Sequence, residues 1–207
     1  MTRTLTRGAQ TRERLLDIAE TAVLQKGFGA TSIDELIFEA GLTKGGFFYH
    51  FRDKNELAKA LLERFTERDG AIFDDIFARA RELSEDPLHS FLIALKLTAE
   101  VMSDLPGGHP GCIVAAVAYH ERQFDPDVRR VTAETMLTWR TRFQAELEAI
   151  AAKYPPRIDI DMGVLADMFS CVVDGAIILG KGLGEADALP KQILAYRAFV
   201  RSVFLGA

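Results

Sequence analysis

Cysteine is scarce in this chain: the sequence contains only Cys112 and Cys171, which stand 59 positions apart. This separation matches none of the short spacings by which cysteines ligate a metal ion or form a redox pair. The sequence therefore predicts no metal site and no cofactor.

Long apolar runs are also missing. The stretch that comes nearest to membrane length, residues 162–184, is interrupted by Asp167, Asp174 and Lys181, whereas a membrane-spanning helix needs about 20 predominantly apolar residues. No positively charged segment followed by an apolar one opens the sequence, as it would in a secretory leader. We therefore expect a cytoplasmic protein with no membrane partner.

No residue pattern typical of catalysis is present. His89, His109 and His120, together with Cys112, offer groups that could act on a substrate, but no pattern of Asn or Asp residues that would orient them accompanies them. The sequence predicts that the protein is not an enzyme. Activity on a generic ester or thiol substrate would contradict this prediction.

Apolar and mixed charged side chains are plentiful across the 207 residues, which suffice for one large or two small domains. The formal net charge of −5 is unevenly distributed, because residues 1–14 contain four arginines and one glutamate and so carry +3, which leaves −8 for the remainder. A basic N-terminal arm at residues 1–8 of an acidic protein is typical of contact with DNA at one end. A tail of incidental charge is the alternative.

Residues 31–57 predict a helix-turn-helix. Ser32 and Glu35 have the spacing of a capping box, which starts a helix, and Gly41 supplies the left-handed residue that ends it. Thr43 then caps a second short helix. Two helices joined by a short turn that contains glycine are the form of a DNA-reading module. The apolar stripe of the first helix consists of Ile33, Leu36, Ile37 and Ala40.

The second helix contains Gly45 and Gly46, each of which costs about 1 kcal/mol in helix propensity relative to alanine. Packing of a protein core does not require two glycines here. Glycine does let the backbone approach another surface closely, such as the wall of a major groove. Lys54 stands at the start of the next helix, where a cation and free backbone N–H groups favour a phosphate contact. The predicted DNA-contacting residues are Arg7, Thr31, Ser32, Thr43, Lys44, Gly45, Gly46, Tyr49, His50 and Lys54.

The run from Gly41 to Phe51 resembles the DNA-binding domain of TetR-type transcriptional regulators. The resemblance covers residues 10–57, roughly a quarter of the chain. Members of that family carry an all-helical ligand-binding and dimerisation domain behind this module. The resemblance therefore implies a DNA-binding domain at residues 1–57 and an effector-binding and dimerisation domain at residues 58–207.

Two residues depart from the pattern of that family. Phe48 stands where a tyrosine is usual and lacks the hydroxyl that would meet a phosphate. Ile37 stands where a small alanine is usual, which predicts a slightly different crossing of the two short helices.

Helical periodicity recurs in the rest of the chain, and no strand pattern or internal repeat interrupts it. Gly27 marks the end of the first helix, and the pairs Asp86-Pro87 and Asp125-Pro126 open two later helices in the favoured order of cap and proline. The predicted fold class is all-α, with a three-helix DNA-binding domain followed by a helical domain and about nine helices in all. Predicted helices outside the helix-turn-helix include residues 10–26, 53–81, 112–123, 161–182 and 189–205.

The last two predicted helices, 161–182 and 189–205, offer more apolar surface than the core of one protomer needs. Together with the family resemblance, this predicts a homodimer held by a four-helix interface, with two DNA-reading helices about 34 Å apart on one palindromic operator. A monomer in which both helices lie in the core is the alternative. The predicted interface residues are Val172, Val173, Ala176, Ile177, Gly180, Val200, Val203 and Phe204.

The family resemblance also implies a small-molecule effector bound among the helices of the second domain. Aromatic side chains and methionines there could line an apolar cavity with a few polar groups, which favours a small apolar or aromatic effector. For each of these residues plain core packing is the alternative. The predicted pocket residues are Phe65, Phe73, Phe77, Met102, Tyr119, His120, Met136, Trp139, Phe143, Met168 and Asp174.

Cys112 follows a glycine-rich loop and stands in the first turn of a predicted helix, where the helix dipole favours a thiolate. One hypothesis is that Cys112 senses oxidants or electrophiles. The alternative is that it packs as a small apolar side chain, as free cysteines usually do. Cys171, on the apolar helix 161–182, is expected to be inert.

The predicted function is a dimeric, ligand-responsive, sequence-specific DNA-binding transcriptional regulator, foremost a repressor that leaves its palindromic operator when a small apolar or aromatic effector binds. The effector would act by favouring one of two separations of the DNA-reading heads. A constitutive architectural DNA-binding protein with a filled core and no effector is the alternative, and a ligand-sized pocket would distinguish the two.

Overall fold

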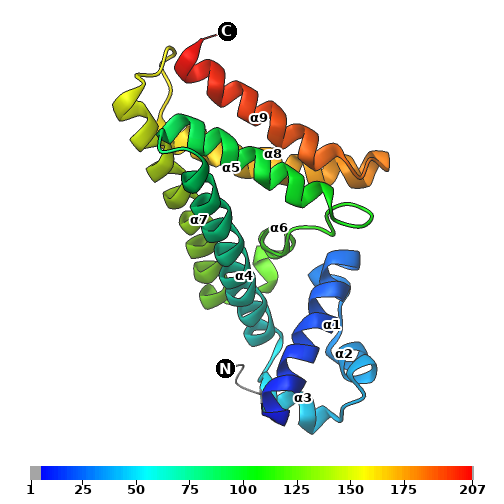
Figure 1. Cartoon of the computed structure of the whole chain (residues 1–207). Helices are drawn as coiled ribbons and strands as arrows, with labels where there is room; N and C mark the ends of the chain where they lie inside the picture. The colour runs from blue at the N-terminus through cyan, green and yellow to red at the C-terminus, as the bar shows by residue number, and fades with distance from the viewer. Residues whose placement is uncertain (1–5, 207) are drawn as a thin grey trace. The chain divides into compact units, whose positions relative to one another are not determined.

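The computed structural model describes residues 6–206, and every regular element in that range is a helix (Figure 1). The predicted all-α fold class is confirmed. Most of the predicted N-terminal arm, residues 1–5, lies outside the described residues, and Arg7 and Gly8 belong to the first helix. The elements are α1 (Arg7–Ala30), α2 (Ile33–Ala40), α3 (Lys44–His50), α4 (Lys54–Leu83), α5 (Pro87–Ser103), α6 (Ile113–Ala118), the short 3₁₀ helix η1 (Glu121–Gln123), α7 (Pro126–Lys153), α8 (Met162–Leu183) and α9 (Ala188–Leu205).

Local capping explains where the DNA-reading helices begin and end. The Ser32 hydroxyl accepts a hydrogen bond from the Glu35 N–H at 3.2 Å, and Gly41 ends α2 in the left-handed conformation with a φ of 63°. The Thr43 hydroxyl likewise accepts from the Gly46 N–H at 3.2 Å and starts α3. These acceptors satisfy backbone N–H groups that have no partner inside the helix.

The first helix has a kink near its end. Gly27 adopts a φ of 84° and a ψ of 161°, a backbone conformation that residues with a side chain rarely adopt. The sequence predicts that the helix ends there, whereas the structure adds one more turn, which buries the ring of Phe28. Thr31 closes this turn, because its hydroxyl donates to the Gly27 carbonyl at 3.0 Å.

The chain folds into two compact units, and their boundary differs from the predicted division at residue 57. The first unit contains the residues up to 67 and residues 111–135, and the second contains residues 68–110 and those from 136 onward. Helices α4 and α7 therefore each begin in the first unit and end in the second, and α6 belongs entirely to the first.

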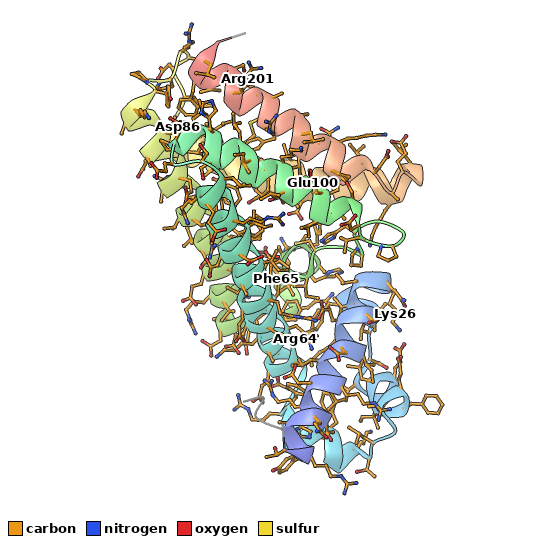
Figure 2. All side chains as sticks on the ribbon, viewed as in Figure 1. Lys26, Arg64, Phe65, Asp86, Glu100 and Arg201 are labelled. Carbon is orange, nitrogen blue, oxygen red and sulfur yellow. The ribbon has the colours of Figure 1, made fainter. Side chains whose placement is uncertain are left out.

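The core of the first unit joins α1, α2, α3, the first turns of α4, and α6. Phe47 and Phe51 are fully buried with ring centroids 5.7 Å apart, so they fix α3 to the unit. Arg64, labelled in Figure 2, is an almost buried side chain of α4 that forms ion pairs with α1. Its partners on α1 are Glu13, Asp17 and Glu20.

The second unit is built around an aromatic cluster, and its helix α9 packs against both α5 and α8. Phe143 stacks on Phe169 with ring centroids 4.3 Å apart, and Trp139 meets Phe73 edge-on at 4.8 Å. The buried Tyr196 hydroxyl donates to the Leu165 carbonyl at 2.8 Å and so joins α9 to α8. The aromatic cluster consists of Phe73, Phe77, Phe91, Trp139, Phe143, Phe169 and Tyr196.

Candidate DNA-binding interface

The exposed side of α3 carries several of the predicted DNA-contacting groups. Tyr49 is 82 % exposed, and Thr43, Lys44 and Gly45 are exposed near the start of the same helix. Phe47 faces the opposite way and is fully buried. The helix therefore has one side anchored in the first unit and another side presented to solvent.

The glycine pair of α3 is not required by packing within the protein. A Cβ atom at Gly45 would meet only the Thr43 hydroxyl, at 3.9 Å. A Cβ at Gly46 would lie 3.5 Å from the same hydroxyl and 3.6 Å from Leu42, which are ordinary contacts. The protein offers room for alanine at both positions, so the close approach of an outside surface stays the prediction for this pair.

The charges around α3 are available to an anionic partner. The Lys44 ammonium pairs with the Asp34 carboxylate of α2 at 3.2 Å, but both side chains are largely exposed. Exposed pairs of this kind contribute only about 0–1 kcal/mol, so a phosphate can displace Asp34. The Tyr49 ring meets the His50 ring edge-on at 5.0 Å, which fixes the position of the tyrosine.

Two predicted DNA contacts point into the first unit; burial corrects the prediction for Thr31, whereas the DNA contact of the half-buried Lys54 stays a prediction. Thr31 is 1 % exposed, and its hydroxyl is bonded to Gly27. The Lys54 ammonium donates to the Phe28 carbonyl at 2.6 Å, and partial burial lowers the Lys54 pKa. Both side chains hold the end of α1. A capping pattern reveals where a helix starts, but it does not reveal which carbonyl lies opposite that start.

The first unit matches a known family. Residues 15–61 match the model for "Bacterial regulatory proteins, tetR family". This segment is a tetR-family DNA-binding domain. The matched residues include all of α2 and α3, so the helix-turn-helix is a DNA-binding module.

Its sequence relatives are transcriptional regulators rather than enzymes. The chain is 27 % identical over 180 residues to the probable HTH-type transcriptional regulator ArpR of Pseudomonas putida, which covers 84 % of this chain and 82 % of that protein. Over 54 residues it is 43 % identical to the HTH-type transcriptional repressor NemR of Escherichia coli, with 26 % and 27 % covered. The chain is therefore similar to transcriptional regulators, and none of these relatives is an enzyme.

The fold extends beyond the matched segment. A transcriptional regulator of the TetR family from Agrobacterium tumefaciens superposes with a TM-score of 0.77 at 18 % identity, covering 96 % of this chain and 100 % of that one. At this identity the likeness shows the fold alone. The helical fold of this chain beyond residues 15–61 is therefore similar to that of the Agrobacterium tumefaciens regulator.

The predicted effector residues do not gather around one cavity in this chain. Phe65, Tyr119 and His120 belong to the first unit, and Tyr119 is 77 % exposed. This outcome corrects the prediction, which assigned all of them to one helical domain. The other predicted residues belong to the second unit. Phe73, Phe77 and Phe143 are buried in the aromatic cluster, and Met136 and Met168 are exposed. Met102, Trp139 and Asp174 are half-buried.

A cavity of about 250 Å³ does exist in the second unit, at a different place. It is lined by the loop 107–109, the C-terminal half of α8 and the turn that leads into α9. Gly108 makes the close approach of these segments feasible, because a Cβ there would lie 3.1 Å from the Ala186 Cα. Burial and the nearby charge of Lys181 lower the pKa of His109 at this cavity. None of the predicted effector residues lines it.

Asp69 is a polar residue of α4 that sequence analysis missed. Its Oδ2 atom is buried and has no hydrogen-bond partner among the described residues. Burial raises the pKa of this carboxyl to about 7, against the opposing influence of the Arg142 charge. The sequence does not distinguish the buried Asp69 from the many exposed carboxylates that α4 also carries.

The predicted dimer residues lie largely inside the second unit, and the prediction is corrected for them. Five are buried in the protomer itself and have no side-chain surface to offer a partner: Ala176, Ile177, Val200, Val203 and Phe204. Val172, Val173 and Gly180 are only partly exposed. Because α8 is apolar on nearly all sides, the sequence did not reveal which of its sides packs inward.

The opposite side of α8 is apolar and exposed. Ile178 is 58 % exposed and Leu183 is 66 % exposed. We call this side the outer stripe of α8; it consists of Val164, Met168, Cys171, Ile178, Leu179 and Leu183. Leu194 and Leu205 are exposed apolar residues of α9. Cys171 is thus an exposed residue rather than a covered one.

Cys112 caps α6, since its Sγ accepts a hydrogen bond from the Ala115 N–H at 3.4 Å. The side chain is half-buried and packs against the core of the first unit. Both hypotheses for Cys112 stay open. Among residues 6–206 no group of three His, Cys, Asp or Glu side chains is placed to hold a metal ion.

Proposed function

We propose that this regulator is a homodimeric repressor that binds a palindromic operator through α3 of each copy. The observation that carries the proposal is the exposed face of α3, where Lys44 and Tyr49 accompany an unobstructed glycine pair. Such a face can enter a major groove, where side chains reach base edges and the backbone comes close to phosphates. The tetR-family match of residues 15–61 supports this role.

The partner in the dimer, in this proposal, is a second copy that covers the outer stripe of α8. Val164, Met168, Cys171 and Ile178 follow one another by steps of four, three and seven residues, which is the spacing of a helix-pairing seam. A continuous exposed apolar surface of this kind marks an interaction site. A two-fold interface also presents two copies of α3 to the two halves of a palindrome.

A lipid membrane is the other surface that could cover this stripe. Helix α8 is long and apolar enough to cross a membrane by length and composition alone. Its inner side, however, packs in the second unit through Leu165 and Phe169, as in the core helix of a soluble protein. We therefore propose a cytoplasmic dimer and not a membrane protein.

Release of the operator, in this proposal, follows the binding of a small apolar or aromatic effector in the second unit. The aromatic cluster would supply the apolar surroundings, and its half-buried member Trp139 lies at the edge of that cluster. A constitutive DNA-binding protein with a filled core is the second candidate. The tight packing of Phe143 and Phe169 favours this candidate, because no cavity separates their rings.

Operator binding is tested first by selecting bound DNA from a random pool and then measuring affinities in a mobility assay. Lys44→Ala should weaken binding and reduce the slope of log affinity against log salt by about one, because one phosphate contact is lost. Tyr49→Ala should instead change which sequence is preferred, because its ring can reach base edges.

Matched control variants are available elsewhere on the surface. Lys191 is an exposed lysine that pairs with Asp187 much as Lys44 pairs with Asp34, and Tyr119 is an exposed tyrosine outside α3. Lys191→Ala and Tyr119→Ala should leave affinity and sequence preference unchanged. Equal affinity for the wild type and both α3 variants would contradict the assignment of α3.

Effector binding can be followed through the single tryptophan of the chain. Trp139 contacts Phe73 and Phe143, so a ligand that enters the aromatic cluster should change its fluorescence. A panel of small neutral aromatic compounds is titrated against the protein, and those that bind are tested for operator release. Saturable fluorescence changes with release support the repressor, whereas operator binding without any such response supports the constitutive candidate.

A further inference from the structure

The first unit is completed by residues from the middle of the chain. The segment 111–135 contributes α6, Phe124 and the first turns of α7 to the same core that holds α1 and α3. Its buried members are Ile113, Val114, Val117, Phe124, Val128 and Val131. The DNA-reading unit is therefore not made by the N-terminal helices alone.

Phe28 is the residue at which this segment meets α1. Its buried ring lies edge-on to the ring of Phe124, with centroids 4.9 Å apart and an interplanar angle of 80°. From another side, the Lys54 ammonium donates to the Phe28 carbonyl at 2.6 Å and lies 5.4 Å from the centre of its ring. Phe28 is thus held between Phe124, which lies two residues before α7, and Lys54, the first residue of α4.

A second contact joins the same two helix starts directly. The Asn55 side-chain oxygen accepts a hydrogen bond from the Asp125 N–H at 3.1 Å. Asp125 in turn caps α7 by accepting from the Val128 N–H at 2.9 Å. We call Phe28, Lys54, Asn55, Phe124 and Asp125 the Phe28 clasp.

The bend of α1 fits closely against η1 beside the clasp. A Cβ on Gly29 would lie 3.4 Å from the side-chain amide of Gln123, and one on Gly27 would lie 3.6 Å from the His120 ring. These are ordinary van der Waals distances, so the bend of α1 and the side chains of this segment lie within contact of each other.

The position of Phe28 decides where α2 begins. The Thr31 N–H donates to the Phe28 carbonyl at 3.3 Å, and the Thr31 hydroxyl donates to the Gly27 carbonyl at 3.0 Å. Ser32, the next residue, caps α2 and belongs to the predicted DNA contacts. A displacement of Phe28 is therefore transmitted within four residues to the N-terminal end of α2.

We propose that Phe124 is a positioning residue for DNA recognition, which through the Phe28 clasp fixes the start of α2 and with it the helix-turn-helix. The proposal rests on the proposed function as a DNA-binding regulator. The helix α7 begins beside the clasp and continues into the second unit.

The test uses the full chain with Phe124→Leu, which keeps an apolar side chain but removes the aromatic edge that faces Phe28. Amide hydrogen exchange is measured without DNA. Exchange of the backbone amides of residues 29–36 should become at least tenfold faster, because the start of α2 is no longer held, while exchange in α8 stays unchanged. Operator affinity should fall about tenfold with an unchanged salt slope, because the phosphate contacts are kept but their positions are not fixed.

Phe91→Leu is the matched control, since Phe91 is a buried ring of the second unit. It should lower the melting temperature without altering exchange at residues 29–36. Asn55→Ala removes only the hydrogen bond to Asp125, so it keeps the test informative if Phe124→Leu does not fold; it should increase exchange at the same residues.

Unchanged exchange at residues 29–36 in both clasp variants overturns the proposal, and so does an equal increase in Phe91→Leu. Failure of the wild type to bind any operator would overturn the proposed function instead. The exchange measurement requires no DNA, so the two failures are distinguishable.

Discussion

At the scale of single residues, surroundings rather than residue type assign the roles near α3. Lys44 and Lys54 stand ten positions apart and both appear in the sequence as cations at a helix start. Lys44 is exposed and pairs with one exposed carboxylate, whereas the Lys54 ammonium donates a hydrogen bond to the Phe28 carbonyl. An exposed cation can exchange its partner for phosphate at little cost, but a partly buried one leaves a carbonyl without a donor. Lys44 is therefore suited to DNA contact, and Lys54 to positioning.

Asp69 gives a prediction at the same scale. Its pKa of about 7 lies above the ordinary value of about 3.9 for an unfolded chain. The native state therefore holds a proton that the unfolded state has released, and the stability this contributes is fully present below pH 4 and lost as the pH rises through 7. The asparagine in the Asp69→Asn variant does not titrate, so the variant does not lose stability in this way as the pH rises. Its stability advantage over the wild type should grow by about 2 kcal/mol between pH 5 and pH 8.

The measurement is urea unfolding followed by Trp139 fluorescence at pH 5, 6.5 and 8. Asp75→Asn, at an exposed position of the same helix, controls for the introduction of an asparagine. A free-energy difference between Asp69→Asn and the wild type that is the same at all three pH values would contradict the prediction.

At the scale of elements, the helix boundaries were predictable because their signals are local. Ser32, Gly41 and Thr43 act through neighbours within four residues, and each does in the structure what its type and position predict. The pairing of helix faces is not local. On α8, Ile177 and Ile178 are adjacent isoleucines, yet the first is buried and the second exposed. Hydrophobic periodicity cannot separate two apolar sides of one helix.

The division into units escaped sequence analysis for a related reason. A domain boundary is usually sought in a linker, but here two of the crossings lie inside continuous helices, between residues 67 and 68 of α4 and between residues 135 and 136 of α7. No change of composition marks these points. The family pattern indicated where the DNA-reading module lies, but not that residues 111–135 complete it.

Arg64 gives a prediction at the scale of elements, because it joins α4 to α1. Its side chain is 11 % exposed and pairs with Glu13, Asp17 and Glu20. Arg64→Ala would remove the cation that these three carboxylates share, which should destabilise the protein by about 1–2 kcal/mol, because the carboxylates stay partly in contact with solvent. Arg140 provides the comparison, since it forms a bidentate ion pair with Asp167 on an exposed surface.

Arg140→Ala should cost less than about 1 kcal/mol, because exposed pairs contribute little. Denaturant unfolding at low and high salt measures both variants. The cost of Arg64→Ala should depend less on salt than that of Arg140→Ala, because the Arg64 side chain is 11 % exposed and that of Arg140 is 46 % exposed. Equal costs for the two variants would show that burial of Arg64 contributes nothing to the connection between α1 and α4.

At the scale of the whole molecule, the proposed function requires α3 and the outer stripe of α8, which lie far apart in the sequence, to act together on the operator. Each copy has one helix-turn-helix, and α3 has fewer than two full turns with which to contact bases. When two linked DNA-reading helices bind the two halves of a palindrome, the affinity exceeds that of a single helix-turn-helix by a factor of about 10² to 10⁴. In the proposed dimer, the outer stripe of α8 would thus be as necessary to tight binding as the residues of α3.

Ile178→Arg tests this dependence. The side chain is 58 % exposed, so the substitution should leave the protomer folded, but it would bury a charge in the proposed interface. We expect a monomer in sedimentation velocity at micromolar concentration and operator affinity lowered by about 10² to 10⁴. Ile72→Arg is the matched control, because Ile72 is an exposed isoleucine of α4 outside the outer stripe and its substitution should leave the dimer intact.

Bifunctional maleimide cross-linking through the exposed Cys171 gives an independent readout, since only a dimer that pairs along α8 brings two of these thiols together. A monomeric wild type, or an Ile178→Arg protein that stays dimeric and binds the operator as tightly as the wild type, would remove α8 from the interface.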